Sequence, residues 1–103
     1  MPADFKAPDD CETMLDVRAG VDATDRELVA LLDRRFGYMR AAARIKPTRD
    51  AVRDEERKAS VIAAAVKDAE ERGIPGQVVA DLWERLVEGS IAYEFEEWDR
   101  TRA

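Results

Sequence analysis

The feature that most constrains the fold is a stretch of about 35 residues, Cys11 to Ile45, without proline and with apolar residues at steps of three and four. This spacing places apolar side chains on one face of an α-helix. At about 1.5 Å per residue the helix would be about 50 Å long, which exceeds the diameter expected of a compact monomer of this size. We therefore expect it to pack against a second copy of the chain.

Two further helices are predicted after this one. Pro47 cannot continue the hydrogen-bond ladder and keeps the preceding residue out of helical geometry, so a loop follows residue 45. A second helix extends over residues 54–72, where apolar residues recur at helical spacing, and Gly73 is a typical stop. A third helix extends over residues 77–100.

The fold class that follows is all-α. The sequence shows neither strand alternation nor an internal repeat, and 103 residues suit one domain. We predict a single domain over residues 1–103, in which residues 1–10 form an irregular arm because they hold two prolines and three aspartates.

Composition narrows the possible functions. The net charge of -6 argues against nucleic acid as a partner, because nucleic-acid binders carry a basic surface. There is no histidine, which removes the usual general base, the usual zinc ligand and every Ser-His or Cys-His nucleophile pair. The scattered glycines form no phosphate-binding loop. We expect neither a metal nor a cofactor.

The same composition indicates a cytoplasmic protein. No apolar run is long enough to cross a membrane, and the first residues lack the apolar segment of an export signal. The single cysteine excludes a disulfide within the chain and suits a reducing compartment.

Four cations occupy positions where the helical pattern calls for apolar residues. They are Arg18, Arg35, Lys46 and Arg57. A positive charge on a buried face is costly unless a negative group meets it. We therefore expect them to bind a small anion; ion pairs with some of the 23 carboxylates of the chain are the alternative.

Helix geometry groups these cations. Lys46 follows Arg35 by about three turns and so returns to nearly the same face of the helix. Arg18 lies about 25 Å from Arg35 along the axis, too far to reach the same pocket in its own chain. In an antiparallel pair of long helices the partner's Arg18 would lie beside Arg35, which favours a site shared between subunits. Arg57 is predicted to point into the same interior.

Glu94 lies on a largely apolar face of the third helix, between Ile91 and Trp98. Burial there favours the protonated carboxylic acid, which can donate a hydrogen bond. The alternative is a carboxylate at the rim of the core that pairs with an arginine.

Several short segments, in their order and spacing, resemble the all-α chorismate mutases of the AroQ class and the related isochorismate pyruvate lyases. The segments are Asp16–Asp22 with Asp25, Leu31–Arg35, Lys46, Val52–Arg57, and Ser90 with Glu94. The resemblance covers nearly the whole chain, from Pro8 to Arg102. It implies an intertwined homodimer of three-helix chains with two sites, each of which borrows the first-helix arginine of the partner.

The resemblance also implies roles for the candidate residues. The partner's Arg18 and Arg35 would bind the two substrate carboxylates, and Arg57 would reinforce one of them. Lys46 would donate to the ether oxygen, whose negative charge grows as the carbon–oxygen bond breaks. Glu94 stands at the second ether-oxygen position, where many members have glutamine, and must be protonated to donate.

Three more positions complete the substrate-binding set that the resemblance implies. Asp54 would contact the ring hydroxyl, and Ser90 a carboxylate. Lys58 stands where typical mutases have a glutamate for the substrate hydroxyl.

The implied activity is the rearrangement of chorismate to prephenate. This reaction is unimolecular, so orientation and electrostatic stabilisation suffice without nucleophile, base or cofactor. One alternative is pyruvate elimination from isochorismate, which the arm Pro8–Cys11 and the short loop 46–54 favour; Ser90, where the lyases have a bulky aromatic residue, and Glu94 favour the mutase. Another alternative is a non-catalytic helical dimer that binds a dicarboxylate.

Overall fold

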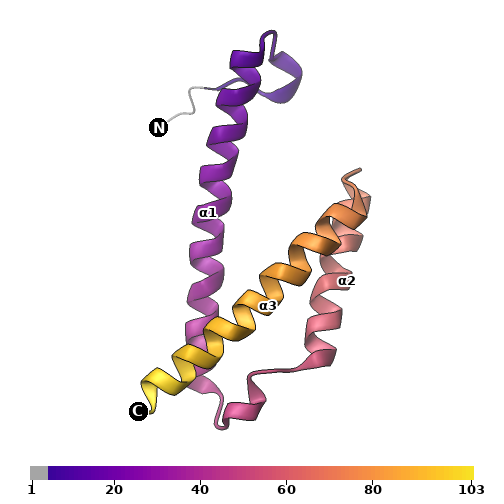
Figure 1. Cartoon of the computed structure of the whole chain (residues 1–103). Helices are drawn as coiled ribbons and strands as arrows, with labels where there is room; N and C mark the ends of the chain where they lie inside the picture. Colours follow the sequence, from indigo (N-terminus) through magenta and orange to yellow (C-terminus); the bar gives the residue numbers. More distant parts are fainter. Residues whose placement is uncertain (1–4) are drawn as a thin grey trace. The chain divides into compact units, whose positions relative to one another are not determined.

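The computed structural model describes residues 5–103, which form three α-helices and two short 3-10 turns and contain no β-strand (Figure 1). The helices are α1 (Met14–Ile45), α2 (Glu55–Glu71) and α3 (Gly76–Thr101), and the turns are η1 (Pro8–Asp10) and η2 (Arg49–Ala51). The predicted all-α class is confirmed, and the predicted ends of α2 and α3 each lie within one residue of the observed ends.

Contacts within the chain define two compact units, Met1–Gly37, described from residue 5, and Tyr38–Ala103. Both contain part of α1, and each has its own packing. The first unit is an arm and most of α1; the second contains the last turns of α1 together with η2, α2 and α3. The single domain expected from the length of the chain stays a prediction.

The first unit starts α1 at Met14, three residues later than the predicted start at Cys11. A capping box fixes this start, because Thr13 Oγ1 accepts a hydrogen bond from the Asp16 amide at 3.1 Å while Asp16 Oδ2 accepts one from the Thr13 amide at 3.3 Å. The arm before it is less irregular than predicted, since Pro8–Asp10 form a 3-10 turn. Residues 1–4 of that arm lie outside the described part of the chain.

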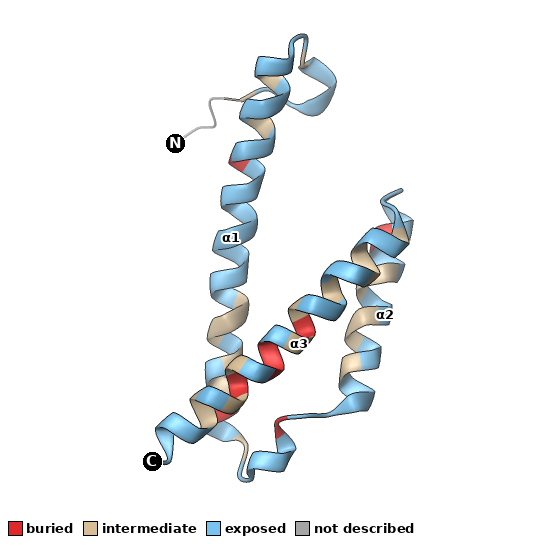
Figure 2. Ribbon diagram, in the orientation of Figure 1, coloured by how far each residue is buried: buried red, intermediate tan, exposed pale blue. Residues whose placement is uncertain are grey.

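The apolar side chains of α1 in the first unit are largely exposed in the single chain (Figure 2). Val21, Leu28, Val29 and Leu31 are each about half exposed or more, at 52%, 53%, 65% and 49%. An isolated amphipathic helix gains most of its stability from packing of its apolar face. This surface therefore favours the expectation that a second copy covers α1. Within residues 5–103 no helix has the length and apolar character to cross a membrane.

The second unit has a small core of its own between η2, α2 and α3. Val52, Val87 and Ile91 are buried, and partly buried side chains pack around them. The packed side chains are Val61, Ile62, Trp83, Phe95 and Trp98. Gly73 ends α2 as predicted, with a φ of 76° in the left-handed region that suits glycine. The turn brings α3 back along α2.

Candidate active site

Lys46 and Glu94 form a close ion pair in the second unit. Lys46 is the first residue after α1, and its Nζ lies 2.7 Å from Oε2 of Glu94 on α3. Glu94 is only 4% exposed, which confirms that it lies on a buried face. Oε2 is buried and, among residues 5–103, has no hydrogen bond beside this ion pair. Lys46 Nζ donates to the Val52 carbonyl at 3.4 Å.

This arrangement suits a ligand oxygen. An ammonium carries three donors, and buried polar atoms in native proteins nearly always have a hydrogen-bond partner. A buried carboxyl oxygen that lacks one, beside an ammonium, is therefore a place where a bound group completes the hydrogen bonding. The pair combines a positive charge with a carboxyl group and provides no nucleophile.

Ser90 lies one turn before Glu94 on the same face of α3 and is 3% exposed. Its hydroxyl donates to the Leu86 carbonyl at 2.6 Å, which satisfies its proton within the helix. The hydroxyl proton of Ser90 is therefore already used in this arrangement. Its predicted contact with a substrate carboxylate stays a prediction.

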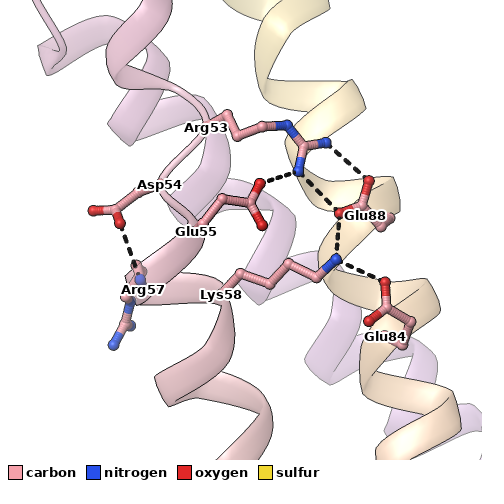
Figure 3. A network of polar contacts seen from close by, with 7 residues as sticks. All are labelled: Arg53, Asp54, Glu55, Arg57, Lys58, Glu84 and Glu88. Atoms are coloured by element: carbon pink, nitrogen blue, oxygen red, sulfur yellow. Dashed lines mark hydrogen bonds and ion pairs between the residues drawn. The ribbon is translucent and has the colours of Figure 1, made fainter.

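Asp54 and Arg57 lie at the exposed start of α2. Asp54 is the N-cap residue, and its Oδ1 accepts a hydrogen bond from the Arg57 amide at 3.0 Å. The prediction that Arg57 points into the core is wrong for the single chain, where Arg57 is exposed and points away from Lys58 and Glu88 (Figure 3). It belongs to the first turn of α2, and the core contacts of this helix begin at Val61.

Lys58 points toward α3 and joins an ionic network there (Figure 3). Its Nζ lies 2.8 Å from Glu84 and 2.7 Å from Glu88. Arg53 makes two hydrogen bonds to Glu88, at 2.9 and 3.1 Å, and one to Glu55 at 2.7 Å. These contacts join the start of α2 to the middle of α3, and they occupy the ammonium that the resemblance places near the substrate hydroxyl.

The network shifts the ionisation of its members. The guanidinium of Arg53, and then the ammonium of Lys58, lower the pKa of Glu88 from 4.5 to about 2. Glu84 and Glu88 in turn raise the pKa of Lys58. The carboxylate of Glu88 therefore stays ionised across the neutral and mildly acidic range.

The remaining two candidates, Arg18 and Arg35, belong to the first unit. Arg18 is exposed, whereas Arg35 is half-buried. Their predicted grouping with Lys46 of the second unit stays a prediction.

Sequence reasoning missed the side chains that anchor the segment after Lys46. Arg49 of η2 donates from Nε and Nη2 to the two carboxylate oxygens of Asp99, at 2.9 and 3.2 Å, and its guanidinium lies 4.6 Å from the centre of the Phe95 ring. A bidentate arginine–carboxylate pair is specific in geometry as well as strong. No local signal reveals it, because the partners are 50 positions apart.

Comparison with known proteins identifies the family. Residues 17–95 match the family model of chorismate mutase type II. Since the match covers most of the chain, the protein belongs to this family of helical enzymes, as the resemblance predicted. An isochorismate pyruvate lyase of Pseudomonas aeruginosa is 33% identical over 98 residues, which cover 95% of this chain and 97% of that relative.

Proposed function

We propose that this protein catalyses the rearrangement of chorismate to prephenate. The observation that carries the proposal is the ion pair of Lys46 and Glu94, whose charged groups lie 2.7 Å apart and in which the Glu94 side chain is buried. The pair occurs in a member of the chorismate mutase type II family. In the rearrangement the ether carbon–oxygen bond breaks and a new carbon–carbon bond forms within one molecule. Negative charge grows on the ether oxygen, and Lys46 donates a hydrogen bond to it.

Glu94 is the second donor to the ether oxygen in this proposal. A carboxyl group can donate only when it is protonated. The substrate brings two carboxylates and displaces water, and both changes favour the neutral form of a buried carboxyl group. Lys46 then leaves the ion pair for the ether oxygen, and Glu94 donates to the same atom.

The binding of the two substrate carboxylates falls to arginines in this proposal. Arg35, and Arg18 from a second copy of the chain, bind one carboxylate each, and Arg57 reinforces one of these contacts. The exposed apolar side chains of α1 support the homodimer that this requires. Asp54, Lys58 and Ser90 complete the proposed set, with Asp54 and Lys58 toward the ring hydroxyl and Ser90 toward a carboxylate.

The second candidate function is pyruvate elimination from isochorismate. It is favoured by the isochorismate pyruvate lyase of Pseudomonas aeruginosa, whose sequence matches this chain over nearly the full length of both proteins. This reaction also breaks the ether bond of a cyclic dicarboxylate within one molecule, so Lys46 would serve both reactions. The small buried Ser90 and the carboxyl group of Glu94 favour the mutase.

The test offers chorismate and isochorismate separately, from about pH 5 to pH 8, and quantifies prephenate and pyruvate. We expect prephenate from chorismate, at a rate that falls as the pH rises. Lys67→Ala, a change of an exposed cation of α2, is the matched control for Lys46→Ala and should keep the wild-type rate. Pyruvate from isochorismate without prephenate from chorismate would establish the lyase, and turnover of neither substrate would leave the non-catalytic dimer.

A further inference from the structure

The C-terminal end of α1 is capped by a side chain from the far end of the chain. The last carbonyl groups of a helix have no partner within the helix. Arg102, which follows α3, donates from Nη1 to the Ala43 carbonyl at 3.0 Å. Its Nη2 donates to the Lys46 carbonyl at 2.8 Å and to the Arg44 carbonyl at 3.4 Å. The guanidinium also places a positive charge at the negative end of the helix dipole, which is favourable.

Trp98 packs against the Arg102 side chain and donates a hydrogen bond to the same carbonyl group, that of Lys46. The guanidinium of Arg102 lies over the Trp98 ring, 4.2 Å from its centre, which is a cation–π contact. The indole Nε1 of Trp98 donates to the Lys46 carbonyl at 3.1 Å. The Lys46 carbonyl therefore receives two hydrogen bonds, both from side chains at the end of α3.

These contacts bear on the side chain of Lys46, because the carbonyl and the side chain leave the same residue. Lysine has a flexible four-carbon stem, so its ammonium is placed well only if its backbone is fixed. Pro47 prevents the helix from continuing and leaves the Lys46 carbonyl to be oriented by other groups. Glu94, one turn before Trp98 on α3, meets the ammonium itself. Residues of α3 and its C-cap thus hold Lys46 at both its backbone and its side chain.

We propose that Arg102, stacked on Trp98, is a positioning residue that orients Lys46 for the reaction. It acts through the Lys46 backbone and does not touch the substrate. The inference rests on the proposed function, in which Lys46 donates to the ether oxygen. Arg102 lies beyond residues 17–95, the part that matches the family model.

The experiment compares Arg102→Ala with Arg100→Ala by steady-state kinetics on the full-length protein. Arg100 lies in the last turn of α3 and pairs with Glu97 of the same helix at 2.9 Å, so it is a matched control. Since a misplacement of about 1 Å can cost a hundredfold in rate, we expect kcat of Arg102→Ala to fall by roughly 10- to 100-fold. KM should change by less than about threefold, because the proposed carboxylate contacts are unaffected, and Arg100→Ala should stay within about twofold of wild type.

Conservative variants separate positioning from a loss of folding. Arg102→Lys keeps the charge but cannot span three carbonyls, so it should recover only part of kcat. Trp98→Phe keeps the ring and removes the indole N–H, and should lower kcat by a smaller factor than Arg102→Ala. Circular dichroism establishes that each variant is folded at the assay temperature. If Arg102→Ala does not fold, Arg102→Lys carries the test, and a wild-type kcat in that folded variant overturns the inference.

The remaining outcomes distinguish the inference from the proposed function. Turnover by the wild type, with equal kcat in Arg102→Ala and Arg100→Ala, overturns the positioning role and leaves the proposed function intact. A wild-type protein that converts neither chorismate nor isochorismate overturns the proposed function, and the role of Arg102 in it falls as well.

Discussion

The two compact units differ in how far their apolar side chains are buried and in how their charged side chains are paired. In the second unit Val52, Val87 and Ile91 form a core, and the buried carboxyl of Glu94 meets Lys46. In the first unit the large apolar side chains of α1 are mostly exposed. The second unit thus forms a small core and its proposed donor pair within one chain, whereas the first presents an apolar surface on α1 that the single chain leaves largely exposed.

The difference separates two parts of the proposed chemistry. The donors to the ether oxygen, Lys46 and Glu94, depend on contacts of one chain with itself. Two of the proposed carboxylate ligands, Arg18 and Arg35, lie in the first unit, where the large apolar side chains of α1 are mostly exposed. We therefore expect substrate binding to depend on a second copy, and the geometry of the donor pair to be independent of it.

The largest effect is expected from two variants, one with a substitution in the second unit and one with a substitution in the first. Lys46→Ala removes the proposed ether-oxygen donor, and Arg18→Ala removes a proposed carboxylate ligand. Each variant alone should lose roughly 10²- to 10³-fold in kcat/KM. If Arg18 serves the site of the partner subunit, a refolded mixture of the two variants contains mixed dimers with one intact site. Random pairing then restores about a quarter of the wild-type activity.

The control for this experiment mixes Lys46→Ala with Glu94→Ala. Both residues belong to the second unit, so every site in a mixed dimer has a defect and activity should stay low. Activity that is restored in neither mixture would show that Arg18 acts within its own chain, or not at all. Restoration in both mixtures would contradict the assignment of Lys46 and Glu94 to one site.

The local features of the fold could be predicted from the sequence. Pro47 and Gly73 act on the backbone of their own segment, so they reveal where α1 and α2 end without knowledge of the rest of the chain. The burial of Ser90 and Glu94 follows from their phase with neighbouring apolar residues on one helix. The capping box of Thr13 and Asp16 is a local feature of the same kind, since its two residues are three positions apart.

The contacts between helices could not be predicted. Lys58 pairs with Glu84 and Glu88, and Arg102 caps α1, because of the register in which α2 and α3 pack and the place where α3 ends. A helical period gives the face of a residue but not the residue opposite to it. Arg57 shows the limit of the period itself, since it is in phase with Val61 but lies in the first turn, where the core contacts of α2 have not begun.

A smaller effect is expected from Glu94→Gln, which tests whether the donor pair includes a protonated acid. A carboxyl donates less often as the pH rises, whereas an amide donates at every pH. The wild-type kcat should therefore fall by about tenfold or more between pH 5 and pH 8, and the variant should give a nearly flat profile. Glu97→Gln, a carboxyl of the same helix paired with Arg100, should keep the wild-type profile. Equal slopes in wild type and Glu94→Gln would show that another group titrates.

The smallest effect concerns stability within the second unit and uses Glu88→Gln. Arg53 and Lys58 lower the pKa of Glu88 from 4.5 to about 2. A carboxyl whose pKa is lower in the folded protein stabilises the fold above its unfolded pKa, and this contribution disappears as the pH falls toward the folded value. At pH 7 the variant should unfold roughly 2 to 4 °C below the wild type. The difference should shrink from pH 4.5 downward.

The control for Glu88→Gln is Glu96→Gln, since Glu96 is an exposed carboxyl of α3 without an ion pair to the described residues. Its Tm should match the wild type at every pH. Because the network of Glu88 joins α2 to α3 of one chain, the Tm difference between Glu88→Gln and the wild type should also be independent of protein concentration. If a second copy covers the exposed face of α1, Leu28→Ala on that face should instead give a Tm difference that depends on protein concentration. A difference for Glu88→Gln that grows on dilution would mean that the second unit, like the first, takes its stability from the partner.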